Sequence, residues 1–190
     1  MIRHAFKEWA VICRALEEGR QAIILRKGGI AEEGGVFKPD HSRFWLFPTF
    51  AHQQRAGVKP EAAALLQAAE GSRPPTGMLR LSHFADVSGT FFVPRLVDAL
   101  ALDPLHLWSE EIIRQRFAYR SEGLYVLAVR VYRIPTPFDV PLKPEYDGCK
   151  TWVELDADLP TAGAEPVIDS RKYASILEEI DGLIHPTGVA

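Results

Sequence analysis

Two apolar runs near the start of the chain are separated by a short polar segment. Glu8–Leu16 is rich in aliphatic side chains, and Ala22–Leu25 follows it after the glycine-containing segment Glu17–Gln21. This arrangement is typical of a β-hairpin, and the β-branched residues within the first run favour strand. A helix over His4–Glu18 is the alternative, because the apolar residues of that segment also fit a helical repeat.

The rest of the pattern predicts further strands and short helices. Phe44–Phe47 is expected to be a buried strand that ends at Pro48. A short helix is expected over Ala62–Ala69, because Pro60 suits a first helical turn and Gly71 suits a helix end. The other expected elements are strands at Met78–Phe84, Leu124–Tyr132 and Thr151–Leu155, and helices from Ser109 to Phe117 and from Ser170 to Ile180.

These elements predict one α+β domain over residues 1–190. The central sheet is expected to be mostly antiparallel or mixed and flanked by about three to four helices, because hairpin-like pairs outnumber strand–helix–strand crossovers. A domain of this length can bury about 70% of its unfolded surface, so it needs no disulfide or metal to fold. We expect one contiguous core that contains Trp9, Ile24, Trp45, Leu127, Val129 and Trp152.

The charge of the chain is unevenly spread. The whole chain carries −3, which argues against binding to DNA or membrane by overall charge. Residues 1–60 contain ten Lys/Arg against six Asp/Glu, a local +4, whereas the segment from Asp139 to the end carries −7. The N-terminal third is therefore the expected place for an anionic ligand. The alternative is that the two regions are solvated faces of opposite sign.

The cysteine content and the apolar runs bear on the compartment. Cys13 and Cys149 cannot form a disulfide framework, and we expect them to stay reduced. No apolar run approaches the ~20 residues of a membrane span, and the apolar stretch before Arg14 is too short for a secretion signal. We therefore expect a cytoplasmic chain with no membrane contact.

A glycine-rich segment over residues 28–35 is the strongest candidate for a ligand site. Glycines let backbone N–H groups approach an anion, and neighbouring cations would neutralise it. The order of residues does not fit a Walker loop, and no GxGxxG motif is present. The alternative is an ordinary turn without a ligand. The candidate anion-binding residues are Arg26, Lys27, Gly28, Gly29, His41, Arg43, His52 and Arg55.

Catalytic motifs are scarce. Cys149 is a weak candidate nucleophile, since the adjacent Lys150 could lower its pKa, although a small residue in a tight turn explains it as well. The six histidines and two cysteines show no metal-ligand spacing, and no cofactor is indicated. No acidic-x-Lys triplet of a restriction nuclease follows Asp40 at a useful distance. Whether the chain is an enzyme stays open.

Motifs along nearly the whole chain resemble the bacterial family called domain of unknown function 1802. The segments that carry this resemblance are Glu8–Val11, Leu25–Ile30, Phe44–Thr49, His52–Gln53, His106–Trp108, Arg116–Phe117, Val129–Tyr132 and Gly148–Val153. The family has no established function. Members found beside restriction-endonuclease-type domains imply a role in restriction or DNA defence, which is an association by context.

The order of the expected elements is also distantly similar to that of Nudix hydrolases. Those enzymes hold a divalent metal through several glutamates on a helix that follows a Pro-Gly-Gly turn. In this chain Thr49 and Phe50 follow Pro48, and the helix expected before Glu70 is mostly alanine and leucine. Even on a related scaffold, that metal chemistry should be missing.

Three functions fit these observations. The first is an accessory or binding domain of a restriction or DNA-defence system, whose partner is nucleic acid or a restriction-system protein. The second is a protein or enzyme that binds a small phosphorylated metabolite in the glycine-rich loop. The third is an interaction domain without a ligand. Salt dependence separates the first two, because binding through several phosphates weakens steeply with salt.

Overall fold

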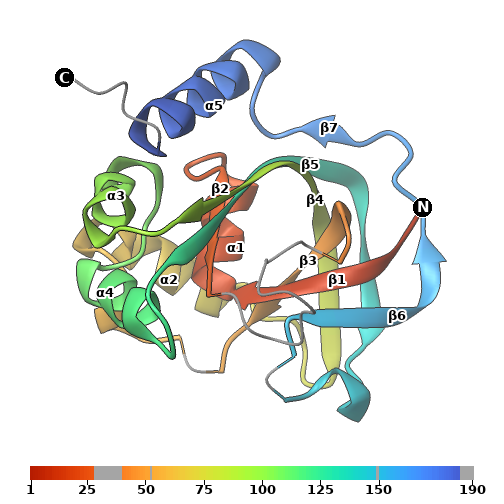
Figure 1. Cartoon of the computed structure of the whole chain (residues 1–190). Coiled ribbons are helices and arrows are strands. Elements are labelled where there is room, and N and C mark those ends of the chain that lie inside the picture. Colours follow the sequence, from red (N-terminus) through yellow and green to blue (C-terminus); the bar gives the residue numbers. More distant parts are fainter. Residues whose placement is uncertain (28–39, 52, 149, 185–190) are drawn as a thin grey trace.

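The computed structural model describes residues 1–27, 40–51, 53–148 and 150–184. They form an α+β fold in which one mixed sheet is flanked by helices (Figure 1). The strands are β1 (Ile2–Trp9), β2 (Ile23–Arg26), β3 (Arg43–Thr49), β4 (Met78–Val93), β5 (Leu124–Pro141), β6 (Trp152–Leu159) and β7 (Glu165–Pro166). The helices are α1 (Ala10–Glu17), α2 (Ala63–Gly71), α3 (Leu96–Ala101), α4 (Glu110–Ala118) and α5 (Ser170–Ile184).

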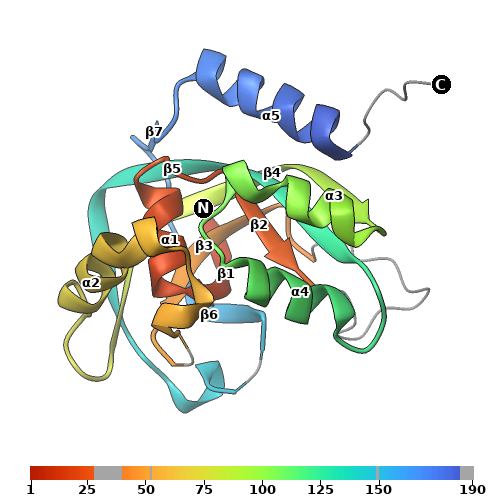
Figure 2. The same ribbon diagram turned by 90° about the vertical axis from the view of Figure 1, so that its left-hand side faces the viewer.

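The sheet has the order β2-β5-β4-β3-β1-β6, and β7 pairs with β5. Among the described strands β1 and β3 run parallel, and every other pair is antiparallel. The expected α+β class with a mixed sheet is thus confirmed. Figures 1 and 2 both show α5 lying across β5, at the opposite end of the molecule from β6.

The expected hairpin at the start of the chain is wrong. Residues up to Trp9 form β1, the apolar run that follows is helix α1, and only the second run, β2, is a strand as expected. The alternative of a helix in this region holds for Ala10–Glu17 alone. Six of the eight residues of α1 are buried, and the two that are not, Arg14 and Glu17, lie on one side of the helix. The helical repeat is therefore present, but the β-branched pair Val11–Ile12 outweighed it and favoured strand.

Most other elements lie where the sequence places them, but the strands are longer. The expected helix start at Ser109 is confirmed, because the Ser109 hydroxyl accepts a hydrogen bond from the N–H of Ile112 and so caps α4. β3 continues through Pro48, which pairs with Glu8 of β1 and lies beyond the residues of β3 that pair with β4. β5 continues through Pro135 and Pro137, which fall in the register shift between two paired stretches of β4 and β5.

A side chain of β2 contacts β1, although three other strands lie between them in the sheet order. β1 and β2 are not neighbours in the sheet order, yet the Arg26 guanidinium donates a hydrogen bond to the carbonyl oxygen of Lys7 at 2.6 Å. The sheet therefore curls until the end of β2 faces the end of β1. This curl brings the ends of β1, β2 and β3 together.

The apolar side chains form two main clusters, which cover the two faces of β3. Successive residues of a strand point to opposite faces, so Phe44 belongs to one cluster and Trp45 to the other. Ile24, Leu127 and Val129 share the first cluster, with Trp9 and Trp152 packed against it. The expectation of one core that includes Trp45 is wrong, because it treated β3 as having one buried face, whereas both faces are covered.

Cys13 is a free, buried thiol on α1, and burial raises its pKa well above the ordinary value. Cys149 lies outside the described residues. No helix in the described part of the chain is both long enough and apolar enough to span a bilayer.

Candidate functional site

A cavity of about 710 Å³ opens where the curled sheet brings strand ends together. Its walls come from the ends of β1, β2 and β3, the start of β4, helix α4 and the loop that leads into β6. The volume lies within the range of small-ligand pockets. Segments far apart in the sequence therefore share one concave surface.

Cationic side chains outnumber carboxylates around this cavity. The lining residues include five cations and two acidic residues, although the chain as a whole is acidic. The cations are Lys7, Arg26, Arg73, Arg116 and Lys150, and the acids are Glu8 and Asp147. This local excess of positive charge suits an anionic ligand.

Glu8 is a buried carboxylate at the junction of β1 and α1, and it is only 3% exposed. Its Oε1 accepts a hydrogen bond from the backbone N–H of Trp9 at 2.7 Å, and its backbone carbonyl accepts one from the Thr49 hydroxyl at 3.0 Å. Its second carboxylate oxygen, Oε2, is buried without a hydrogen-bond partner. Glutamate is almost never this buried unless it is paired, so Glu8 calls for an explanation beyond packing.

Two arginines lie close to Glu8. Arg26 spans from β2 to the Lys7 carbonyl with its guanidinium 4.4 Å from the ring centre of Phe6, and its Nε is buried without a partner. Arg116 donates to the Leu25 carbonyl at 3.1 Å and stacks 3.8 Å from the Trp108 ring. Burial lowers the pKa of Arg116 to about 10, with Glu8 acting to raise it and Arg26 to lower it. Arg116 therefore stays charged at neutral pH.

Aromatic rings complete the walls. Trp9, Phe47, Phe50 and Tyr146 line the cavity together with the cations. The Arg73 guanidinium lies 4.3 Å from the ring centre of Phe50 and pairs with Glu70, and Lys7 lies 5.5 Å from the ring of Phe47. Aromatic rings beside cations can hold a flat anionic molecule by stacking and by charge.

The position of the Trp9 ring depends on Gly57. A Cβ atom at Gly57 would lie 2.6 Å and 2.7 Å from two carbons of that ring, which is closer than real Cβ contacts come. We expect Gly57→Ala to lower the free energy of unfolding by about 1–3 kcal/mol, because the indole must move within a packed site. Chemical denaturation would measure this loss. Gly71→Ala, where nothing lies within 4 Å of the added atom, is the control and should not destabilise the fold; equal losses in both variants would contradict the packing argument.

The residues expected from the sequence do not form one group. Arg26 lines the cavity, but the neighbouring Lys27 ammonium instead donates to the carbonyls of Phe117, Ser121 and Gly123 and so fastens a turn. Arg43 forms a two-point ion pair with Asp86 at the other end of β3, about 20 Å along the strand from Thr49.

The remaining expected residues lie elsewhere or outside the described residues. His41 stacks on His4 with ring centres 3.5 Å apart, and burial followed by the charge of His4 lowers its pKa. Arg55 is an exposed residue of a short 3₁₀ helix at Arg55–Gly57. The glycine-rich loop with Gly28 and Gly29, His52 and the candidate nucleophile Cys149 lie outside the described residues.

Sequence reasoning missed most of the cavity. Lys7 and Glu8 of β1, Arg73, Arg116 and Lys150 come from four separate segments, and no spacing along the chain indicates that they meet. The sequence held one signal of a buried charge: Glu8 directly precedes the longest apolar run of the N-terminal region. In the part of the chain that the structure describes, no group of three or more His, Cys, Asp or Glu side chains is placed to hold a metal ion.

A second cavity of about 460 Å³ lies on another part of the sheet, beside His83 of β4 and Arg133 of β5. The Nδ1 atom of His83 is 2.9 Å from the Ser82 hydroxyl and 3.6 Å from a carboxylate oxygen of Glu17. Both contacts use the same ring nitrogen, so the three groups cannot relay a proton from serine through histidine to glutamate. The arrangement therefore lacks the geometry of a catalytic triad.

Comparison with known families settles the affiliation of the chain. The family described as "Domain of unknown function (DUF1802)" matches residues 5–179. The chain belongs to this family. The family description assigns no activity, so function has to be argued from the site. A search of curated proteins finds no match.

Solved structures of the ASCH protein from Zymomonas mobilis resemble the chain. One is 10% identical, covers 92% of this chain and 93% of its own, and has a TM-score of 0.44. Two single-residue variants of the same protein give 11% identity with a TM-score of 0.43 and 10% identity with a TM-score of 0.44. At this level of identity no residue role passes from that protein to this chain.

Proposed function

We propose that this chain is a nucleic-acid-binding domain that holds a single-stranded segment across the cavity at the strand ends. The observation that carries the proposal is the composition of that cavity, with five cations and four aromatic rings around about 710 Å³. Proteins that bind single strands combine a positively charged groove with rings on which bases stack. Both features occur together here.

The placement of the cations suggests that some contact the base and others contact the phosphates. Arg26 and Arg116 are held by backbone carbonyls and aromatic rings, so they are fixed groups for the base. Arg73 and Lys150 are exposed, which suits contact with the phosphates of a strand that passes over the opening. A base in a duplex is stacked and paired, so entry into the cavity favours an unpaired strand.

A restriction or DNA-defence system is the proposed context, because the family resemblance implies it. In such a system this domain would be the part that engages nucleic acid. The cavity also suits a small phosphorylated metabolite, which is the second candidate function. The two candidates differ in their salt dependence, since a ligand with one or two phosphates releases far fewer counterions than a strand does.

Fluorescence anisotropy with a labelled single-stranded oligonucleotide, measured over a salt series, tests the proposal. We expect log K to fall linearly with log salt, with a slope of about −0.7 for each phosphate contacted. The double variant Arg73→Ala/Lys150→Ala should make the slope shallower by about 1.4, because two phosphate contacts are lost. A duplex of the same sequence should bind more weakly.

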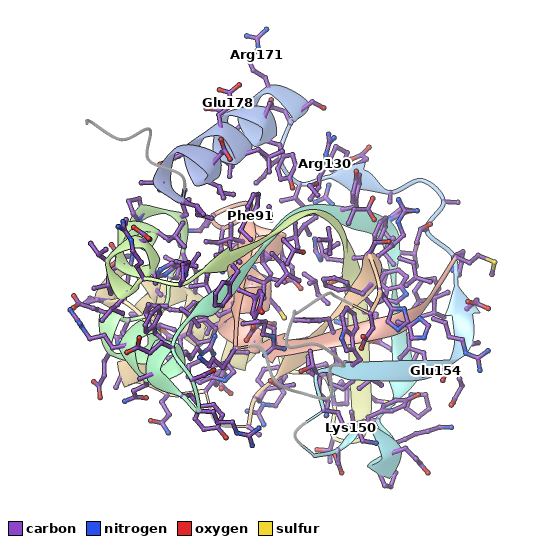
Figure 3. All side chains as sticks on the ribbon, in the orientation of Figure 1. Phe91, Arg130, Lys150, Glu154, Arg171 and Glu178 are labelled. Atoms are coloured by element: carbon purple, nitrogen blue, oxygen red, sulfur yellow. The ribbon has the colours of Figure 1, made fainter. Side chains whose placement is uncertain are left out.

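The matched control removes the same charge at the far end of the molecule. Arg171 and Lys172 lie on α5, and Figure 3 shows Arg171 at the opposite end of the structure from Lys150. The double variant Arg171→Ala/Lys172→Ala should keep the slope of the unmodified chain. Absence of binding at low salt, or the same change of slope in both double variants, would refute the proposed interface.

A further inference from the structure

Two polar atoms in the wall of the cavity have no hydrogen-bond partner. They are Oε2 of Glu8 and Nε of Arg26, and both are buried. One is an acceptor and the other is a donor. Glu8 and Arg26 also lie close together, because the Arg26 guanidinium binds the carbonyl of the residue that precedes Glu8.

These unpaired atoms have a free-energy cost that a ligand could remove. Buried polar groups are nearly always hydrogen-bonded, and a charged one left without a partner destabilises the fold. The orientation of Glu8 is fixed, since Oε1 is held by the Trp9 N–H and the backbone is held by the Thr49 hydroxyl. Oε2 is therefore a preset acceptor rather than a surface carboxylate with free rotation.

We propose that the cavity recognises guanine, with Glu8 accepting from the base and the two arginines donating to it. This inference rests on the proposed binding of nucleic acid. Guanine carries two neighbouring donors, N1–H and the N2 amino group, and two acceptors, O6 and N7. A carboxylate matches the donors, and an arginine binding O6 and N7 is the commonest specific contact to this base.

The other bases match the wall less well. Adenine and cytosine each present one amino group beside a ring nitrogen that is an acceptor, and this acceptor would face the Glu8 carboxylate. Thymine and uracil present a single N–H between two carbonyl groups, so a carboxylate gains one donor and meets an acceptor on either side. Guanine alone offers paired donors to Glu8 while its acceptors remain for Arg26 and Arg116.

The test uses labelled oligothymidylates of about nine nucleotides, a length within the site sizes of single-strand binders. The central base is guanine, inosine, adenine or thymine. We expect the guanine strand to bind at least about tenfold more tightly than the thymine strand, and the inosine strand to fall between them because it lacks the N2 amino group. The inosine strand tests recognition by the unmodified protein, whatever the behaviour of any variant.

The matched variants change the two carboxylates of the cavity. Glu8→Gln replaces the acceptor oxygen by an amide and should abolish the preference for guanine over inosine. Asp147→Asn alters the exposed carboxylate and should retain that preference. Thermal unfolding of both variants confirms that they are folded before binding is compared.

The outcomes separate this inference from the proposed function. Equal affinity for the four strands, or an undiminished preference in a folded Glu8→Gln variant, overturns guanine recognition while nucleic-acid binding stands. Absence of binding to every strand overturns nucleic-acid binding, and it overturns guanine recognition as well if guanosine 5′-monophosphate also fails to bind. Guanosine 5′-monophosphate is the second probe: if it binds with the same dependence on Glu8 while no strand does, guanine recognition holds and the ligand is a free nucleotide.

Discussion

Replacing Trp45 by alanine is expected to lower the free energy of unfolding by about 3–5 kcal/mol, which for a chain of this length lowers Tm by roughly 10–15 °C. Trp45 is fully buried in the second apolar cluster, where its ring meets Phe84 and Phe138 edge to face. Its indole N–H also donates to the carbonyl of Ile2 at 3.2 Å. The alanine variant loses the packing and leaves that carbonyl without its partner. Denaturant unfolding monitored by circular dichroism measures the change.

The variant Trp45→Phe separates the two contributions. It retains a ring against Phe84 and Phe138 and loses mainly the hydrogen bond to the Ile2 carbonyl. We therefore expect its free energy of unfolding to fall by only about 1–3 kcal/mol. If the free energy of unfolding of Trp45→Ala lies within about 1 kcal/mol of that of the unmodified chain, the second apolar cluster contributes little to stability.

Local signals in the sequence were reliable where they involved caps and turns. The Ser109 cap, the start of a helical segment at Pro60 and the strand that begins at Leu124 all lie as expected. They depend on short-range chemistry. The Ser109 hydroxyl accepts a hydrogen bond from a helix N–H, the Pro60 ring presets φ, and Gly123 before the strand has a positive φ. Such signals need no knowledge of the rest of the chain.

Features set by tertiary packing were misjudged. Helix α1 carries a narrow polar side with Arg14 and Glu17. Its buried β-branched residues Val11 and Ile12 favoured strand until packing decided for helix. The two apolar faces of β3 show the same difficulty, since a fully apolar run such as Phe44–Phe47 gives no alternation to indicate which side is covered. The N-terminal part of β1 was missed altogether.

The candidate site was predictable only in part. The positive excess of the N-terminal third pointed to Arg26, but the structure uses Lys27 to fasten a turn and pairs Arg43 with Asp86. The partners of Arg26 in the cavity come from helix α4 and from loops before β4 and β6. Only the curl of the sheet joins these segments, and no periodicity along the chain encodes that curl.

Replacing Glu17 by glutamine is expected to stabilise the protein at pH 8 by about 3 kcal/mol and to change little at pH 4.5. Burial raises the pKa of Glu17 from 4.5 to about 7, with Arg14 lowering it and Glu18 raising it. The native state therefore favours the neutral acid, and this contribution to stability is present below pH 4.5 and lost as pH rises through 7. Glutamine stays neutral throughout. Denaturant unfolding between pH 4.5 and 8 at constant ionic strength measures the difference.

The difference in free energy of unfolding between variant and parent reports on Glu17 alone, because the two buried histidines affect both proteins equally. Burial lowers the pKa of His83 and of His106 to about 4, so each removes stability as pH falls from 6.5 toward 4, in both proteins alike. His83 faces Glu17 at 3.6 Å, but its low pKa comes from burial and from the charges of Arg133 and Arg14, which the variant retains. Glu18→Gln is the matched control, because Glu18 is exposed at the end of α1, and we expect it to change the free energy of unfolding by no more than about 0.5 kcal/mol at every pH. Parallel stability curves for Glu17→Gln and the parent chain would show that Glu17 titrates at its ordinary pKa in the folded protein.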